Sequence, residues 1–178
     1  HLPFDEVEFN QMSGRAGRDG VLSLIHLAYG ANDARINERI LALDAPPRDD
    51  LVTLYRVLSA RDRQARLGGD GGFTATNAEL AGDCVALHSG CALNDKGVSC
   101  GIAIFRELGF VEASGYGAGR RVALVPSPER MDLTRSIRYL EGMRALEEFS
   151  RYRDWALTSS AQDVLERINR PIVPTLQG

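Results

Sequence analysis

The 178-residue sequence predicts an α/β fold with mostly α content, built from three successive segments. Apolar residues recur at helical spacing through most of the chain, which is the pattern of amphipathic helices. Two short apolar runs enclose a glycine-rich loop at residues 114–121, which predicts a hairpin of two strands. The pair Pro46-Pro47 ends one helical pattern, and Pro128 follows the hairpin. These prolines divide the chain into residues 1–47, 48–128 and 129–178.

In the first segment the sequence predicts a short helix, a buried strand and a longer helix. The short helix opens at residues 4–6. The run at residues 21–27 is mostly apolar and lies between two glycines, which predicts the strand. Asn32 or Asp33 can cap the longer helix. Its apolar residues, which share one face, are Ile36, Ile40 and Leu43.

The second segment predicts the order helix, strand, helix, helix and hairpin. After a first helix and a glycine-rich loop, residues 73–76 predict a strand, and Asn77 can cap a second helix. Asn94 or Asp95 can cap the third helix, which Gly109 closes. The apolar face of the first helix holds Leu51, Leu54, Tyr55 and Leu58. That of the third holds Val98, Ile102, Phe105 and Leu108.

This order is that of a winged helix-turn-helix domain. In such domains the third helix enters the major groove, and the hairpin, called the wing, contacts the DNA backbone. The solvent face of the third helix and the glycine-rich loop both carry polar or cationic side chains. The candidate DNA contacts are Lys96, Ser99 and Arg106 on the helix and Tyr116, Arg120 and Arg121 on the wing.

The third segment predicts a helical tail. Apolar residues recur at helical spacing from Leu133 to Phe149, and Ser159 with Gln162 can form a capping box for a last helix. Residues 147–155 mix charged and aromatic side chains. They predict either a helix end packed on the winged-helix domain or a surface that contacts single-stranded DNA.

The most specific pattern is Gln11-x-x-Gly14-Arg15-x-Gly17-Arg18. Arginines three residues apart on a helical turn point the same way and can face one nucleotide. An arginine supplied across a domain interface stabilises the transferred phosphoryl group. The small residues between them allow close packing of the backbone. The pattern therefore predicts a site that senses a nucleoside triphosphate.

This pattern, with Asp19-Gly20 after it, resembles motif VI of superfamily 2 helicases and looks most like the RecQ family. The resemblance implies that residues 1–47 are the edge of a RecA-like second motor domain. It also implies roles in binding and hydrolysing ATP. Arg15 and Arg18 would contact the γ-phosphate or act as an arginine finger, and Gln11 and Gly14 would complete the ATP-binding set.

The wing hypothesis fits the same resemblance, because RecQ helicases carry a winged-helix domain after the motor. In some members an aromatic residue at the wing tip separates the strands of a duplex. Tyr116 is the candidate for that role, and the alternative is an aromatic residue on the surface without such a role.

The sequence lacks both the glycine-rich phosphate loop and the Asp-Glu-x-His string with which a helicase motor holds phosphates and magnesium. We expect ATP and Mg²⁺ to be held by a parent enzyme and not by this fragment alone, which should not hydrolyse ATP. With His1 in first position, the chain is expected to be the C-terminal portion of a DNA helicase of repair and recombination. The expected partners are DNA (forked, duplex or single-stranded) and the upstream motor domains.

The tail resembles the ends of bacterial proteins in which a RecQ-like helicase is joined to the RecJ single-strand exonuclease. An exonuclease domain is therefore a further expected partner. The sequence has no Asp and His cluster suited to a two-metal nuclease.

The composition argues mildly against strong DNA binding by this chain alone. The net charge is −3, so no global basic field would draw the chain to nucleic acid. Residues 48–128 carry equal numbers of basic and acidic residues. With no apolar run of membrane-spanning length and no secretory leader, the sequence predicts a soluble, cytoplasmic protein without a membrane partner.

The cysteines are Cys84, Cys91 and Cys100, an odd number without a Cys-x-x-Cys pair, which predicts reduced thiols and no metal site. Many RecQ helicases carry a four-cysteine zinc module after motif VI, and this chain departs from that pattern. The alternative is a zinc site of three cysteines and His88.

Two other functions stay open. The winged helix could be a non-enzymatic module for transcription regulation, which would bind palindromic sites as a dimer. It could also dock onto its own motor or an exonuclease partner without touching DNA.

Overall fold

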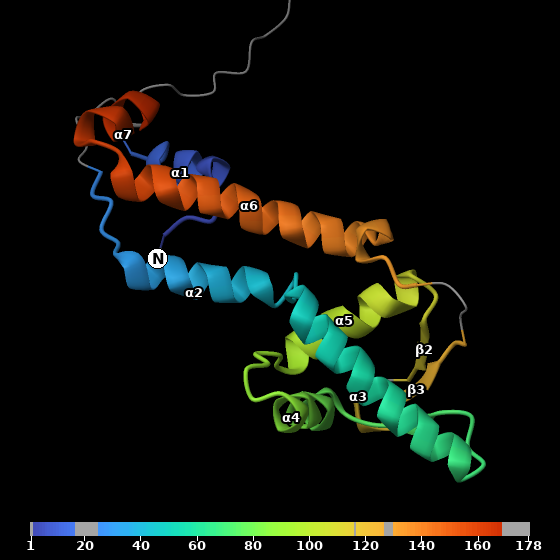
Figure 1. Ribbon diagram of the computed structural model, residues 1–178. Helices are drawn as coiled ribbons and strands as arrows, with labels where there is room; N and C mark the ends of the chain where they lie inside the picture. The colour runs from blue at the N-terminus through green and yellow to red at the C-terminus, as the bar shows by residue number, and fades with distance from the viewer. Residues whose placement is uncertain (1, 17–24, 116, 127–129, 169–178) are drawn as a thin grey trace, which may run out of the picture. The chain divides into compact units, whose positions relative to one another are not determined.

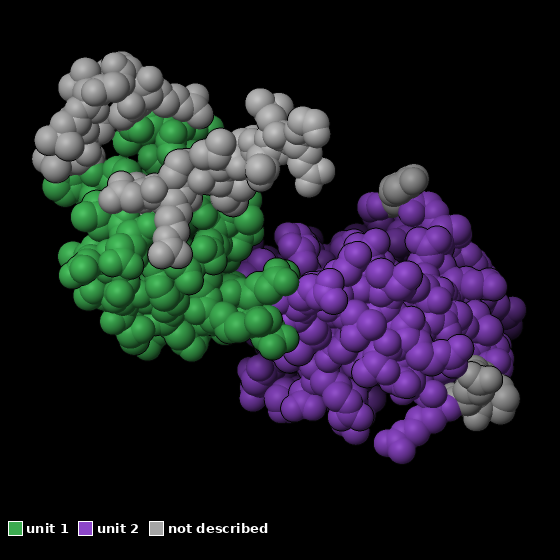
Figure 2. All heavy atoms as spheres, turned by 90° about the horizontal axis from the view of Figure 1, so that it is seen from above, with its two compact units in different colours: residues 1–39, 145–178 green, residues 40–144 purple. Residues whose placement is uncertain are grey.

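The computed structural model describes residues 2–16, 25–115, 117–126 and 130–168 (Figure 1). In this part the chain is mostly helical with a three-stranded sheet, in agreement with the predicted mostly α content. The chain forms two compact units (Figure 2). We call residues 1–39 with 145–178 the terminal unit and residues 40–144 the central unit. The three predicted segments therefore do not coincide with the units, because most of the first and third segments lies in one unit.

The central unit has the predicted order of helices and strands. Its sheet is antiparallel with the order β1-β3-β2, and Val122 of β3 pairs with both Phe73 of β1 and Ala113 of β2. Short 3₁₀ turns interrupt two loops, η1 (Gly117–Gly119) and η2 (Leu133–Arg135). The main elements are α3 (Arg48–Leu67), β1 (Phe73–Thr74), α4 (Asn77–Leu87), α5 (Asp95–Glu107), β2 (Val111–Ser114) and β3 (Arg121–Leu124).

The core of the central unit forms where α3, α4 and α5 meet the inner face of the sheet. α3 and α5 approach closely at Gly101, where a Cβ atom would lie 2.6 Å from Cδ2 of Leu54. Burial of each large side chain contributes about 1.5–3 kcal/mol. The predicted apolar faces are buried at Leu51, Leu54, Leu58, Val98, Ile102 and Phe105, whereas Tyr55 and Leu108 are half-buried.

Two of the predicted helix boundaries are confirmed and one is displaced. Asn94 caps α5 through its side chain, and Gly109, with φ of 77°, follows the end of that helix. For α4 the cap is Thr76 and not Asn77, because Thr76 and Glu79 form a reciprocal capping box.

The terminal unit contains α1 (Glu6–Ser13), most of α2 (Ala31–Ala42), most of α6 (Ile137–Thr158) and α7 (Ala161–Ile168). Its core is aromatic. Phe9, Phe149 and Tyr152 are buried, and the ring of Trp155 meets that of Phe9 edge-on at 5.8 Å. The guanidinium of Arg167 lies 4.4 Å from the centre of the Trp155 ring, a cation–π contact.

The predicted strand at residues 21–27 is not found where the structure can be described. Residues 25–30 have no regular structure, and residues 21–24 lie outside the described part. The next helix, α2, begins at Ala31, and Asp33 in its first turn accepts from the Gly30 N–H. Its predicted apolar face is largely open, with Ile36 55% and Ile40 42% exposed. α2 buries Ala34 and Asn37 instead, because Asn37 Nδ2 donates to the Leu2 carbonyl at 2.6 Å.

The helical tail is confirmed as helical, with different details. Ile137, Leu140 and Met143 on α6 are 42–66% exposed, although their spacing predicted a buried face. The cap before α7 is Ser160, which exchanges hydrogen bonds with Asp163. The predicted box of Ser159 and Gln162 is therefore displaced by one residue.

Candidate nucleic-acid interface

The predicted nucleotide-sensing residues lie at the end of α1. Gln11 is exposed on the helix, and Arg15 is exposed in the turn after it. Gly14 ends the helix, and its N–H donates to the Asn10 carbonyl at 2.8 Å. A Cβ atom at Gly14 would lie 2.8 Å from that same oxygen, so glycine suits this close approach. Arg18 lies outside the described residues, so the expected pairing of two arginines on one nucleotide stays a prediction.

The predicted contact residues of α5 are all exposed. Lys96, Ser99 and Arg106 lie on the side opposite the buried Val98 and Phe105. α5 is therefore amphipathic in the sense that the sequence predicted. Its open side offers one hydroxyl and two cations.

The positive charge of Lys96 is already partnered. Its Nζ atom lies 2.8 Å from Oδ2 of Asp44, in the turn before α3. The Cys100 thiol donates to the backbone carbonyl of the same Asp44 at 3.1 Å, which holds this turn beside the first half of α5. An exposed ion pair contributes only about 0–1 kcal/mol, so a phosphate could compete for Lys96. Lys96 is nevertheless a weaker candidate than Arg106.

Glu107, next to Arg106, is engaged by the start of α6. Its Oε2 atom accepts from the Ser136 hydroxyl at 2.7 Å, and its Oε1 atom accepts from the Ile137 N–H at 2.6 Å. The hydrogen bond from Ser136 is the main cause that lowers the pKa of Glu107. The carboxylate thus serves as a cap of α6 and stays charged while it does so.

The predicted wing, formed by β2, β3 and the loop between them, presents its two arginines differently. Arg121 is exposed on β3, where it pairs in register with Ser114 and Thr74. Arg120 is half-buried, and its Nε and Nη2 atoms are buried without a hydrogen-bond partner among the described residues. Burial also lowers the pKa of Arg120. Tyr116 lies outside the described residues, so its strand-separating role stays a prediction.

The sequence did not reveal how β3 is attached to α3. Asp62, only 5% exposed, accepts from the Leu124 N–H at 3.1 Å. Arg66 donates through Nε to Asp62 at 2.6 Å and through Nη2 to the Leu124 carbonyl at 2.7 Å. An Asp and an Arg four residues apart were the available signal, but that spacing is common on solvated helix faces. This cluster holds the base of the wing against α3.

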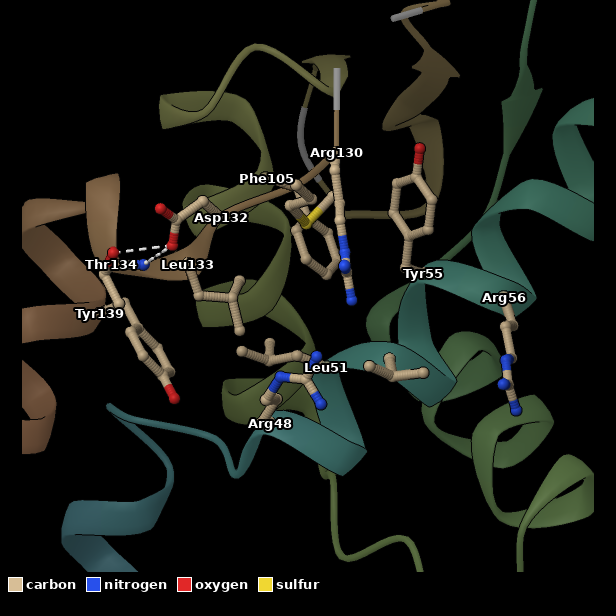
Figure 3. A pocket seen from close by; sticks show the side chains of 12 residues that line it. Arg48, Leu51, Tyr55, Arg56, Phe105, Arg130, Asp132, Leu133, Thr134 and Tyr139 are labelled. Atoms are coloured by element: carbon tan, nitrogen blue, oxygen red, sulfur yellow. Dashed lines mark hydrogen bonds between the residues drawn. The ribbon is translucent and has the colours of Figure 1, made fainter. Parts of the chain in front are cut away.

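The central unit also holds a cavity of about 620 Å³ that sequence analysis missed (Figure 3). We call it the aromatic cavity. It lies where the first half of α3 meets Phe105 of α5, the segment before α6 and the first turn of α6. Its lining comes from three separate stretches of sequence, so no local pattern could signal it. The lining residues are Arg48, Leu51, Val52, Tyr55, Arg56, Phe105, Arg130, Met131, Asp132, Leu133, Thr134 and Tyr139.

The cysteine thiols are free and buried. Burial is the main cause that raises the pKa of Cys84 to about 12, and it also raises the pKa values of Cys91 and Cys100. Across the described ranges no group of three or more His, Cys, Asp or Glu residues is placed to hold a metal ion. That set includes His88, so the alternative zinc site has no support in the geometry.

The mixed charged and aromatic stretch of α6 is packed. Phe149 and Tyr152 are buried, and Arg153 forms ion pairs with Glu38 and Asp154. These contacts favour a packed helix end over a surface for single-stranded DNA. The partners, among them Phe9 and Glu38, belong to the terminal unit, so the predicted packing on the winged-helix domain is not what these contacts show.

Comparisons with known proteins give no relative. No protein-family model matches the chain, and neither the curated proteins nor the solved structures yield a significant match. Of the helices in the described ranges, none has the length and apolar character needed to cross a bilayer.

Proposed function

We propose that the chain is the C-terminal, DNA-binding portion of a RecQ-like ATP-dependent DNA helicase that acts in repair and recombination. The observation that carries this proposal is the combination of chain order and sheet order in the central unit. The order α3-β1-α4-α5-β2-β3, with strands arranged β1-β3-β2, is compatible with a winged helix-turn-helix domain and supports that part of the proposal. The helicase-like pattern from Gln11 to Arg18 precedes this domain, as it does in the family.

In this proposal duplex DNA lies against the open side of α5 and the wing. Ser99 and Arg106 reach toward the groove, and Arg121 reaches a phosphate. Arg120 supports the wing from within, because its guanidinium is largely buried. Lys96 would join only after releasing Asp44. The contact set is therefore smaller than the six residues that sequence analysis predicted.

The end of α1 belongs to the edge of the second, RecA-like motor domain in this proposal. Gln11, Gly14, Arg15 and Arg18 would face ATP and Mg²⁺ held by upstream motor domains. In the complete enzyme, Arg18→Ala should abolish ATP hydrolysis while DNA binding remains. Retained turnover in that variant would exclude the role of Arg18.

DNA binding is tested by fluorescence anisotropy of this chain with forked, duplex and single-stranded DNA over a series of salt concentrations. We expect binding to forked or duplex DNA that weakens as salt rises, because released counterions drive it. Arg121→Gln should lower duplex affinity and reduce the salt slope by about 1, as the loss of one phosphate contact does. Arg106→Gln should lower duplex affinity by about 1–3 kcal/mol, as the loss of a groove contact does. Arg63→Gln is the matched control, because Arg63 is an exposed arginine on α3 that is not among the predicted DNA contacts.

A docking module without DNA is the second candidate. The observations that favour it are the ion pair between Lys96 and Asp44 and the balanced charge of residues 48–128. An absence of binding to any DNA at low salt would support it and overturn the first proposal. Sequence-specific binding as a dimer would instead support a module for transcription regulation.

A further inference from the structure

The aromatic cavity combines an apolar interior, aromatic rings and exposed arginines in one open space (Figure 3). We propose that it binds one unpaired nucleotide of single-stranded DNA. The base would lie against Tyr55 and Tyr139, with the buried Phe105 supporting Tyr55, and the phosphate would lie at Arg48 and Arg130. This inference rests on the proposed function for its choice of nucleic acid, but it uses residues other than those proposed to contact duplex DNA on α5 and the wing.

The aromatic wall is fixed in place before any ligand arrives. Tyr55 meets Phe105 edge-on with ring centres 5.4 Å apart, and it meets Phe110 in the same way at 6.4 Å. Phe105 is buried, whereas Tyr55 and Tyr139 are half-buried and line the cavity. Rings held in this way offer a surface on which any base can stack. Phe110 directly precedes β2, so the cavity adjoins the base of the wing.

The charges around the cavity favour an anion. Arg48, Arg56 and Arg130 are exposed, and none of them forms an ion pair with another described residue. The carboxylate in the lining is Asp132, whose Oδ1 atom accepts from the N–H and hydroxyl of Thr134 at 3.0 and 2.7 Å. Figure 3 draws Arg48 and Arg130 toward the centre of the cavity and Arg56 at its margin. A guanidinium group can donate two parallel hydrogen bonds to two oxygens of one phosphate, which suits these arginines to a nucleotide.

The size and the apolar interior favour an unpaired base. A volume of about 620 Å³ is within the range of small-ligand sites. Leu51 and Leu133 present apolar surface to the interior. Desolvation of the apolar faces of a flat base costs little free energy there. A base within a duplex is stacked and paired, so it cannot enter such a cavity without being flipped out. We therefore expect the site to distinguish single strands from blunt duplexes.

The test uses a short oligothymidylate with a terminal 2-aminopurine, whose fluorescence reports stacking, together with fluorescence anisotropy. Val52→Trp places a large side chain in the cavity from a half-buried position on α3, and Arg130→Gln removes a charge from it. We expect Val52→Trp to weaken binding of the oligonucleotide by about tenfold, as the loss of one stacked base does. Arg130→Gln should weaken binding and reduce its salt dependence, because one phosphate contact is lost. Val52→Trp should also abolish the change in 2-aminopurine fluorescence. Arg63→Gln again serves as the control for one lost charge on α3.

Duplex binding separates this proposal from the proposed function. The two cavity variants should bind blunt duplex like the wild type, whereas Arg106→Gln and Arg121→Gln should lose duplex affinity and keep the 2-aminopurine response. If the wild-type chain does not bind duplex DNA, that result would count against the winged-helix proposal alone. Wild-type affinity of both cavity variants for the oligonucleotide would overturn the cavity proposal.

A peptide is the competing occupant. If the oligonucleotide does not bind but a fluorescent peptide of alternating aspartate and leucine does, and Val52→Trp abolishes that binding, the cavity is a peptide site. That outcome would also overturn the proposal. Circular dichroism of each variant, compared with the wild type, shows whether a loss of binding reflects loss of the fold.

Discussion

The central and terminal units are stabilised by different kinds of core. The central unit buries a mainly aliphatic cluster among three helices and a sheet, and it attaches β3 to α3 through the buried Asp62. The terminal unit relies on aromatic rings from α1 and α6, supported by ion pairs such as that of Arg153 with Glu38.

The two cores also differ in how far their parts are separated along the chain. The central core joins elements that follow one another in sequence, whereas the terminal core joins Phe9 to Tyr152 and Trp155. Local contacts cost less chain entropy to form than distant ones. The central unit is therefore the part that we expect to form first and to tolerate isolation better.

Removal of one buried phenylalanine from each unit should have the largest effect. Phe105 is 1% exposed and Phe149 is fully buried, so Phe105→Ala and Phe149→Ala should each destabilise the fold by about 3–5 kcal/mol. The fluorescence of Trp155, the single tryptophan, reports the terminal core, and hydrogen exchange in α3 and β3 reports the central one. We expect Phe149→Ala to shift the urea midpoint of the fluorescence more than Phe105→Ala does, and the reverse for hydrogen exchange.

The controls are Phe105→Leu and Phe149→Leu, which keep most of the buried volume and should recover much of the stability. Equal shifts of both reporters in both alanine variants would mean that the units unfold as one. The interpretation that the two units have independently stable cores would then be wrong.

An intermediate effect is expected at the attachment of β3 to α3. Asp62→Asn should destabilise the central unit by about 1–3 kcal/mol, because Arg66 loses its charged partner and a buried amide replaces a carboxylate. Urea unfolding followed by hydrogen exchange in β3 measures this change. Asp70→Asn, at an exposed position in the loop after α3, is the matched control. If both variants lose the same stability, the buried hydrogen bonds of Asp62 contribute no more to the free energy of unfolding than an exposed carboxylate does.

Local patterns predicted the central unit better than the terminal one. Spacing alone located α3 and α5 and their buried faces, because each helix packs on elements that lie near it in the chain. The caps of α4 and α7 were misplaced by one residue, at Asn77 and Ser159. Neighbouring Asn, Ser and Thr side chains can all accept from a helix N-terminus, and the local backbone conformation decides which one does.

The terminal unit shows what periodicity does not reveal. Apolar spacing on α6 predicted one continuous buried face, but Ile137 and Leu140 are exposed and Phe149 is buried. A pattern indicates which residues could be buried, and it cannot say which distant segment will cover them. The aromatic cavity was not predicted for the same reason, since Arg48, Phe105 and Arg130 are far apart in sequence. A charged residue such as Asp62 is also expected from the sequence to be exposed to solvent, because its hydrogen-bond partners are visible only in the structure.

The smallest effect is expected at the surface, where Glu107 caps α6 within the central unit. Its pKa in the folded state is lowered, chiefly by the hydrogen bond from Ser136. A lowered folded pKa means that the stability from this carboxylate is present above its unfolded pKa and is lost as the pH falls through the folded value. The stability gap between the wild type and Glu107→Gln should therefore be largest near neutral pH and shrink below the ordinary glutamate range.

Urea midpoints measured from pH 7 down to about pH 3, a range that spans the ordinary carboxyl pKa values, would show this change. Glu112→Gln is the control, because Glu112 is an exposed carboxylate on β2, the strand that follows α5. We expect the pH-dependent gap for position 107 and not for position 112, since only Glu107 accepts hydrogen bonds from Ser136 and the Ile137 N–H. A gap at position 107 that stays constant with pH would mean that the cap works equally well when neutral. The start of α6 would then be held to the central unit by packing, as at Gly142, where a Cβ atom would lie 2.5 Å from that of Ala45.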